Sequence, residues 1–189
     1  DTFAYHNYKA SYYSRNTSHP NMGYSTFKTM GNGMKFTTSW PASDLEMMQQ
    51  SIDDYINKDQ FLAYYMTFSG HYRYDFDSNP MCRRNKSAVD NLNYSTSVKA
   101  YISCNLELEY ALEYLMQRLT DAGKLNDTVI VLAADHYPYG LTENEYNELA
   151  GQEIDTTFGK YKSCFICYNA GMEPVQIDTP CCNIDILPT

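Results

Sequence analysis

Val129-Ile130-Val131-Leu132-Ala133-Ala134 is a continuous apolar run of strand length that leads directly into Asp135-His136. Its composition predicts a strand buried on both faces, as in a parallel sheet. Before this run, residues 95–122 carry apolar side chains at helical spacing, and Gly123 is suited to end that helix. The buried stripe of the helix is predicted to consist of Ile102, Leu106, Tyr110, Leu112, Leu115 and Leu119.

Similar elements lie on either side of this unit. Ser43-Asp44-Leu45-Glu46 is a capping box and predicts a helix that ends at Lys58-Asp59. Residues 61–68 form a second strand-length apolar run, a capping box over residues 142–145 predicts a short helix, and residues 163–168 predict a further buried strand. This alternation indicates an α/β protein with a parallel-dominated sheet flanked by helices. The helix after Ser43 is predicted to bury Leu45, Met48, Ile52 and Tyr55.

Two segments lack this periodicity. Residues 1–40 are rich in Tyr, Ser, Asn, Thr and Gly and predict an elaborated loop region with short strands. Residues 75–93 are polar, contain Asn79-Pro80 and two adjacent arginines, and predict a surface excursion.

The overall composition limits the class of protein. The chain has 189 residues, of which 43% are hydrophobic, so it forms one domain or a large part of one. No apolar run approaches the roughly 20 residues of a membrane helix. The net charge of −9 argues against a nucleic-acid binder. Residues 1–40 nevertheless carry +3, which indicates either a site for an anionic ligand or an uneven sampling of surface charge.

The six cysteines are too few for a disulfide scaffold in a chain of this length. Cys164, Cys167, Cys181 and Cys182 raise the alternative of a zinc site. Alternation along a strand would turn Cys164 and Cys167 to opposite faces, so we favour core cysteines or incidental disulfides, and their pairing stays open.

Two predicted strands end in polar residues, and ligands of open α/β sheets bind beyond the carboxyl ends of the strands. Asp135-His136 combines a carboxylate with an imidazole, a pair suited to a divalent ion of the Mn, Mg or Zn type. His71 follows Ser69-Gly70 after the other strand. Taken alone, each of these residues has an equally ordinary structural interpretation.

The N-terminal segment holds His6 and Arg15 among several tyrosines. A guanidinium group binds phosphate through two parallel hydrogen bonds, and a flanking tyrosine can stack on a polyol or sugar. The alternative is a packed, tyrosine-rich loop with an exposed arginine.

Four motifs, in order along the whole chain, resemble the lipoteichoic acid synthase family, the phosphoglycerol transferases of the sulfatase and alkaline phosphatase superfamily. The first runs from His6-Asn7-Tyr8 through Tyr13-Ser14-Arg15-Asn16 to residues 19–24. The others are Ser69-Gly70-His71-Tyr72, Asp135-His136-Tyr137 and the ending over residues 184–189.

The resemblance implies an enzyme with a sulfatase-like catalytic domain on the extracytoplasmic face of a bacterial cell membrane. It would transfer phosphoglycerol from phosphatidylglycerol to a teichoic-acid-type polymer or glycan. Asp135 and His136 match metal ligands, with Mn²⁺ the expected ion and Mg²⁺ or Zn²⁺ the alternatives. His6, Arg15 and His71 match residues that hold the phosphoglycerol group, and Tyr13 matches an aromatic residue packed beside them.

The sequence departs from the family pattern in two places. Tyr8 stands where some members have a carboxylate. The threonine nucleophile and a glutamate ligand of the family are expected upstream, as are the membrane helices. Residues 1–189 therefore correspond to the C-terminal part of a single catalytic domain, an incomplete α/β unit expected to be inactive alone.

Two further functions stay open. One is a sulfatase or phosphodiesterase hydrolase of the same superfamily, although the spacing of His6 and Arg15 favours the transferase. The other is a non-catalytic module in which the tyrosine-rich segment binds a glycan or teichoic acid without a metal.

Overall fold

The computed structural model describes residues 1–186. Its main sheet has four strands in the order β3-β2-β1-β4, and every neighbouring pair is parallel. The central strand β1 (Thr2–Lys9) lies between β2 (Thr26–Met30) and β4 (Leu62–Met66), while β3 (Gly33–Met34) extends the edge beside β2. The predicted α/β class with a parallel-dominated sheet is confirmed. Residues 187–189 of the predicted family ending lie outside the described residues.

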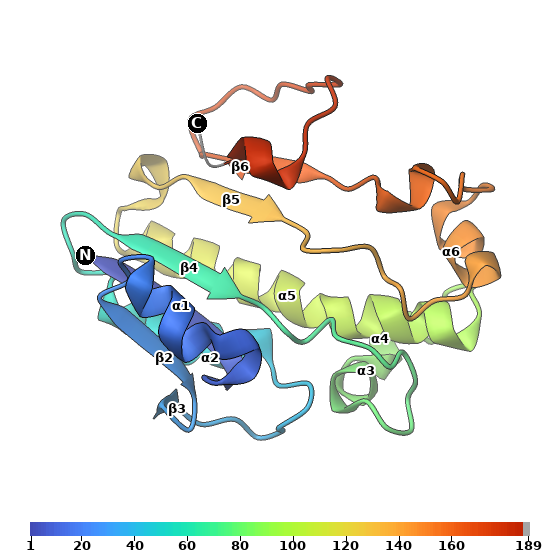
Figure 1. Ribbon diagram of the computed structural model, residues 1–189, viewed down its shortest axis with the longest axis horizontal. Coiled ribbons are helices and arrows are strands. Elements are labelled where there is room, and N and C mark those ends of the chain that lie inside the picture. Colours follow the sequence, from blue (N-terminus) through green and yellow to red (C-terminus); the bar gives the residue numbers. More distant parts are fainter. Residues whose placement is uncertain (187–189) are drawn as a thin grey trace.

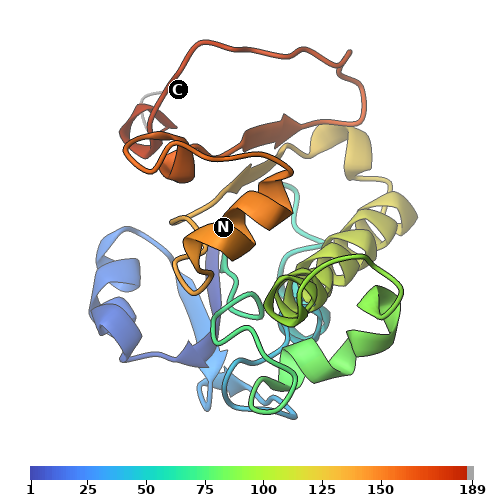
Figure 2. The same cartoon turned by 90° about the vertical axis from the view of Figure 1, so that its right-hand side faces the viewer.

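Helices cover both faces of this sheet (Figures 1 and 2). Helix α1 (Arg15–Asn21) lies on one face, and α2 (Asp44–Ser51) and α5 (Thr96–Asp121) lie on the other. The core between the sheet and helices α2 and α5 consists of Phe3, Tyr5, Met34, Met47, Ile52, Tyr55, Ile56 and Leu119. Burial of these apolar side chains is the main stabilising contribution of the fold.

Helix α5 confirms the predicted long helix. Ser95 precedes its first turn, and Gly123 follows it with φ of +67°, a backbone conformation that glycine adopts without strain. The predicted stripe is confirmed at Leu119, which is buried, and at Leu115, which packs half-buried against the core. Its other members, Ile102, Leu106, Tyr110 and Leu112, are only half-buried, because the most buried face of α5 also carries small and polar residues. No helix within residues 1–186 is long and apolar enough to cross a membrane. The buried residues of α5 are Val98, Ala100, Ser103, Cys104, Glu107, Ala111 and Leu119.

The two predicted capping boxes differ in outcome. Ser43 caps α2 by accepting a hydrogen bond from the backbone nitrogen of Glu46, but the Glu46 carboxylate binds Thr37 and Arg84 instead of closing the box. Thr142 and Glu145 form the complete reciprocal box at the start of α6 (Glu143–Ala150). Met48, Ile52 and Tyr55 are buried as predicted, whereas Leu45 is only half-buried.

Both segments without periodicity hold regular structure. Residues 1–40 contain the predicted short strands, β1, β2 and β3, but β1 is the central strand of the main sheet and not part of an elaborated loop. Residues 75–93 contain α3 (Pro80–Arg84) and α4 (Lys86–Val89), which pack on α5 and bury Met81 and Val89. The excursion is therefore part of the core. The Asn79 side chain starts α3 by accepting from the backbone nitrogens of Met81 and Cys82.

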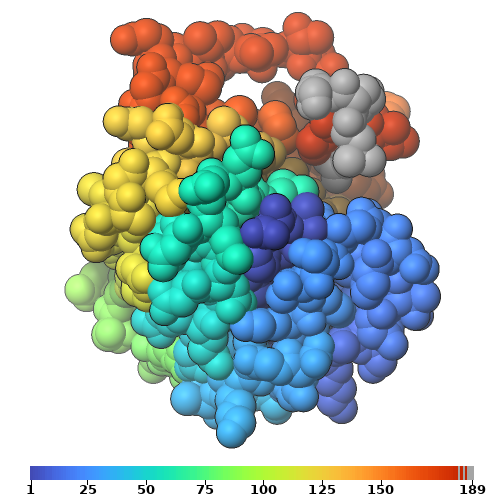
Figure 3. Space-filling view, turned by 90° about the vertical axis from the view of Figure 1, so that its left-hand side faces the viewer, coloured from blue at the N-terminus to red at the C-terminus, as the bar shows by residue number. Residues whose placement is uncertain are grey.

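A second, two-stranded sheet pairs β5 (Ile130–Ala133) with β6 (Phe165–Tyr168) in antiparallel fashion. The prediction of fully buried strands is wrong for both. Val131 is 51% exposed, and all four residues of β6 are exposed, because each strand has a single partner in the described part of the chain. In Figure 3 the residues beyond β6 form an arch above the rest of the molecule. Short 3₁₀ turns occur at Tyr12–Ser14, Ile52–Asp54, Leu125–Asp127, Gly159–Tyr161 and Asn183–Ile186.

Candidate active site

The arrows of β4 and β5 point in the same direction in Figure 1, so the segments that follow them emerge on the same side of the molecule. The segment after β4 carries His71, and the segment after β5 carries Asp135 and His136. Strand β1 is parallel to β4 and brings Tyr8 and the tyrosine-rich segment to the same end of the sheet. The polar residues that follow the two predicted strands therefore lie on one side of the molecule, although β4 and β5 belong to different sheets.

His6 lies on β1 and is fully buried. Its Nδ1 lies 3.0 Å from the backbone oxygen of Met66 on β4, which assigns the proton to Nδ1. Desolvation is the largest cause that lowers the pKa of His6 to about 4, and the charge of Arg15 acts in the same direction. His6 is therefore neutral at neutral pH. Its Nε2 is a buried acceptor with no hydrogen-bond partner among the described residues.

Aromatic rings cover His6. The ring centroids of Phe68, Tyr12 and Tyr8 lie 5.5, 6.2 and 6.5 Å from that of the imidazole. Trp40 extends this cluster, with its ring 4.7 Å from Phe68 and 4.8 Å from Tyr8. His6 thus lies beneath the surface of the site, and a ligand would reach it only after one of these rings moves.

Arg15 begins helix α1 directly after two residues in the left-handed region, Tyr13 with φ of 52° and Ser14 with φ of 54°. Such backbone is strained in residues other than glycine and is frequent at functional sites. The guanidinium carbon lies 5.5 and 5.2 Å from the rings of Tyr12 and Tyr13. Its one hydrogen bond, to the backbone oxygen of Tyr12, leaves Arg15 without an ion pair within residues 1–186. Tyr13 itself is 77% exposed.

The imidazole of His71 is held by ring packing and by a hydrogen bond. Its ring packs 4.6 Å from those of Phe68 and Trp40, and its Nδ1 donates to the backbone oxygen of Tyr72 at 2.8 Å. The preceding Gly70 lies against Asn105 of α5, where an added Cβ would come within 2.8 Å of Oδ1. This close approach explains why glycine precedes the histidine. The Nε2 atom of His71 is thereby left for a ligand.

Asp135 and His136 are both exposed, and Oδ2 of the carboxylate lies 3.5 Å from Nε2 of the imidazole. The Nδ1 atom of His136 donates to the backbone oxygen of Tyr137 at 2.8 Å. Metal-binding histidines are typically oriented by such a bond, because it fixes the tautomer whose Nε2 carries the free lone pair.

This geometry fits a divalent cation. Two ligands at about 2.1 Å from one ion lie roughly 3.0 to 3.4 Å apart in octahedral or tetrahedral coordination, close to the separation observed here. Two acceptor atoms that face one another also favour a positive charge between them. Within residues 1–186, however, no group of three or more His, Cys, Asp or Glu side chains converges on a metal position. Asp135 and His136 therefore offer two donor atoms, which by themselves would not complete the coordination of an ion.

Tyr139 connects these parts and was not identified from the sequence. Its ring lies 4.7 Å from His136 and 5.4 Å from Tyr72, which in turn packs 5.3 Å from His71. The Gly140 backbone lies against Tyr72 and Tyr74, since an added Cβ would meet each of them at 2.9 Å. The only available signal was a second aromatic residue soon after His136, which does not reveal its partner on another loop.

The charges of Arg15 and Asp135 both act on Tyr64. Burial is the main cause that raises the pKa of Tyr64 on β4, and both charges act on it as well: Arg15 lowers this pKa and Asp135 raises it. Asp135 and Tyr13 similarly contribute to the raised pKa of Tyr139, after desolvation. Ring contacts thus connect His136 to His71 through Tyr139 and Tyr72, and the charge effects link Asp135 to Tyr139 and to Tyr64.

Comparison with known proteins gives the relatives of this fold. The chain is similar to the lipoteichoic acid synthase LtaP from Listeria monocytogenes, with a TM-score of 0.68 and 20% identity over 92% of this chain and 44% of that one. It is also similar to the Streptococcus pyogenes phosphoglycerol transferase GacH, solved with sn-glycerol-1-phosphate. Here the TM-score is 0.61, with 18% identity over 90% of this chain and 43% of that one.

Among curated proteins, lipoteichoic acid synthase 1 of Bacillus subtilis (strain 168) is 29% identical over 100 residues, which are 51% of this chain and 15% of that protein. The chain therefore spans less than half the length of each of these relatives. The sulfatase family model matches residues 1–189. The fold and superfamily expected from the four motifs are confirmed: this chain belongs to the sulfatase family.

Proposed function

We propose that this chain is part of the catalytic domain of a bacterial phosphoglycerol transferase. The enzyme would move glycerol phosphate from phosphatidylglycerol to a polymer or glycan acceptor at the outer face of the cell membrane. The observation that carries the proposal is the setting of Arg15, a guanidinium without an ion pair in the described part of the chain. It follows β1 of the main sheet, on the side of the molecule where the segments after β4 and β5 carry His71, Asp135 and His136.

The residues have distinct roles in this proposal. Arg15 would bind the phosphate through its free N–H groups, which also stabilise charge that develops during transfer. His71 would contact the phosphoglycerol group through Nε2, because its Nδ1 is already used by Tyr72. His6 is neutral and its unused Nε2 can only accept, so it suits a glycerol hydroxyl better than a phosphate oxygen. The exposed Tyr13 would pack against the glycerol carbons.

Asp135 and His136 would hold a divalent metal, for which Mn²⁺ is our first choice, with other ligands from outside this chain. Such an ion can lower the pKa of a hydroxyl nucleophile and neutralise charge on the transferring phosphoryl group. The protein's own contribution is the orientation of His136 by Tyr137 and of the surrounding loop by Tyr139.

The test uses the full-length protein with phosphatidylglycerol in detergent micelles. Release of diacylglycerol is measured with and without added Mn²⁺, for the wild type and for His136→Ala and Asp135→Asn. We expect release that depends on the metal and is lost in both variants. Lys99→Met is the matched control, because Lys99 on α5 donates to the backbone oxygen of Asp90 and is not one of the residues proposed to bind substrate or metal.

Two other outcomes would overturn the proposal. Metal-dependent hydrolysis of a generic sulfate or phosphate ester, without release from phosphatidylglycerol, would indicate a hydrolase of the same superfamily. Binding of glycerol 3-phosphate that is unaffected by metal, with no turnover of either substrate, would indicate a non-catalytic binding module.

A further inference from the structure

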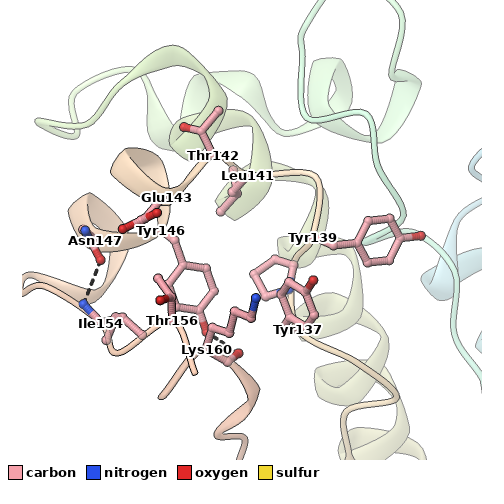
Figure 4. A pocket seen from close by; sticks show the side chains of 11 residues that line it. Tyr137, Tyr139, Leu141, Thr142, Glu143, Tyr146, Asn147, Ile154, Thr156 and Lys160 are labelled. Atoms are coloured by element: carbon pink, nitrogen blue, oxygen red, sulfur yellow. Dashed lines mark hydrogen bonds between the residues drawn. The ribbon is translucent and has the colours of Figure 1, made fainter. Parts of the chain in front are cut away.

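A cavity lies next to the candidate active site, between the loop that follows His136 and helix α6 (Figure 4). Its volume is about 200 Å³. Tyr137 and Tyr139 belong to the wall of this cavity, and Tyr139 also packs on His136. The opposite wall comes from α6 and from the segment that leads to β6. The two sites therefore share one loop, residues 137–141.

The lining combines aromatic faces with polar groups. Tyr137, Tyr146 and Lys160 point toward one another, whereas the ring of Tyr139 points away from them (Figure 4). The Tyr146 hydroxyl donates to the backbone oxygen of Lys160 at 3.1 Å, which fixes the ring as a wall. Glu143 also lines the cavity, and its carboxylate has no hydrogen bond or ion pair within residues 1–186. An acceptor is therefore available to a ligand.

The size of the cavity restricts the ligand to one small unit. The cavity volume of about 200 Å³ is below the 300 to 1,000 Å³ or so of drug-sized sites. A single sugar ring or a glycerol phosphate has suitable dimensions.

The charges of the lining distinguish between these two ligands. Lys160 is its one cation, and Glu143 is its one anion. The ammonium group already lies 5.6 Å from the ring centroid of Tyr137 and 4.9 Å from that of Tyr161. Attraction to these two rings reduces its availability to a phosphate, and the carboxylate of Glu143, elsewhere in the lining, repels an anion. A neutral ligand with several hydroxyl groups fits this balance better than an anion.

The aromatic rings favour the same ligand. The faces of a pyranose ring carry C–H groups, which pack on the negative face of a π system. Its hydroxyl groups would donate to Glu143 and accept from Lys160. The side chain of Thr156 also has no partner among the described residues. Its hydroxyl can both donate a hydrogen bond to a sugar hydroxyl and accept one from it.

We propose that this cavity, lined by Tyr137, Glu143, Tyr146, Thr156 and Lys160, binds one neutral sugar unit of a glycan acceptor. The assignment of the sugar as acceptor rests on the proposed transferase function, whereas the binding itself does not. The shared loop brings a bound glycan to the side of the site where Asp135 and His136 lie.

Saturation-transfer NMR on the full-length protein tests this proposal with two neutral probes, methyl β-D-glucopyranoside and methyl N-acetyl-β-D-glucosaminide. Glycerol 3-phosphate is the anionic comparison. We expect at least one glycoside to bind, and its affinity to fall at least about fivefold in Glu143→Gln and in Lys160→Met. Glu143→Gln removes only a charge that has no partner, so the fold is retained. Lys162→Met, at an exposed lysine outside the cavity, is the matched control.

Arg15→Ala separates this proposal from the proposed function. Glycoside binding that persists in this variant and is lost in Glu143→Gln supports the cavity, even if no diacylglycerol is released from phosphatidylglycerol. The proposal is overturned if neither glycoside binds at millimolar concentration while diacylglycerol release is intact. It is also overturned if glycerol 3-phosphate binds in a manner that depends on Lys160 and not on Arg15.

Discussion

The side-chain amide of Asn7 donates to Oδ1 of Asp44 at a distance of 2.8 Å. Both residues are fully buried, and the same carboxylate accepts from the backbone nitrogens of Phe68 at 2.8 Å and Ser69 at 3.2 Å, and from the Ser69 hydroxyl. Asn7 follows His6, and Ser69 lies two residues before His71. One carboxylate at the start of α2 therefore connects the two segments that carry these histidines.

Asp44→Ala should destabilise the protein by about 3 kcal/mol, because the backbone nitrogens of Phe68 and Ser69 would lose their partner inside the core. Urea unfolding followed by circular dichroism measures this change. Asp59→Ala is the control, since Asp59 is exposed and its carboxylate has no partner in residues 1–186. A loss below about 1 kcal/mol would show that water replaces the carboxylate and that Asp44 does not hold the two strand ends together.

The sequence predicted those elements whose signals are local. Helix α5 was found because 26 residues repeat at helical spacing before a glycine, and α6 because Thr142 and Glu145 lie at the spacing of a capping box. Short strands were predicted in residues 1–40, but β1 was not recognised as the centre of the sheet. Its tyrosines, histidine and asparagine are polar in composition, and they are buried through partners such as Asp44 and Asp54, which lie far away along the chain.

The site was predictable to a similar extent. Position after a strand drew attention to His71 and the Asp135-His136 pair. The tyrosine-rich setting drew attention to His6 and Arg15, and the motif resemblance added Tyr13. The burial of His6 and the role of Tyr139 depend on rings contributed by separate loops, which no spacing along the sequence reveals.

Gly140→Ala tests the contact between the loops that follow β4 and β5. An added methyl group would lie 2.9 Å from both Tyr72 and Tyr74, so one loop must move. We expect a loss of about 1 to 3 kcal/mol in stability, as in other overpacked sites. Gly171→Ala is the matched control, because its nearest neighbour would be Asn169 Oδ1 at 3.5 Å, an ordinary contact. Equal thermal midpoints for the two variants would contradict the close packing of Gly140.

Arg15→Ala should weaken the binding of glycerol 3-phosphate at least about tenfold, because charge-assisted hydrogen bonds to phosphate are lost. Isothermal titration calorimetry of the full-length protein measures this effect. Lys9→Ala removes the same charge from a neighbouring exposed position and should change the affinity less than about twofold. Similar losses in both variants would mean that Arg15 acts only through the general positive charge of the segment.

The protonation of His6 should make the stability of the folded protein depend on pH. Burial lowers the pKa of this imidazole from 6.5 to about 4 in the folded protein, so the unfolded chain takes up the proton first as the pH falls. The stability associated with neutral His6 is therefore complete above pH 6.5 and decreases progressively down to about pH 4. Over this interval the loss should reach about 3 kcal/mol.

His6→Asn isolates this contribution. Asparagine does not titrate, and its amide can replace the Nδ1–H donor to the backbone oxygen of Met66. The free energy of unfolding in urea, measured at several pH values between 7.5 and 4, should fall more steeply for the wild type than for His6→Asn. His19 is the necessary comparison, because burial and the charge of Arg15 lower its pKa in the same direction. His19→Asn should leave the His6 part of the slope in place, and parallel curves for the wild type and His6→Asn would show that His6 does not titrate as a buried group.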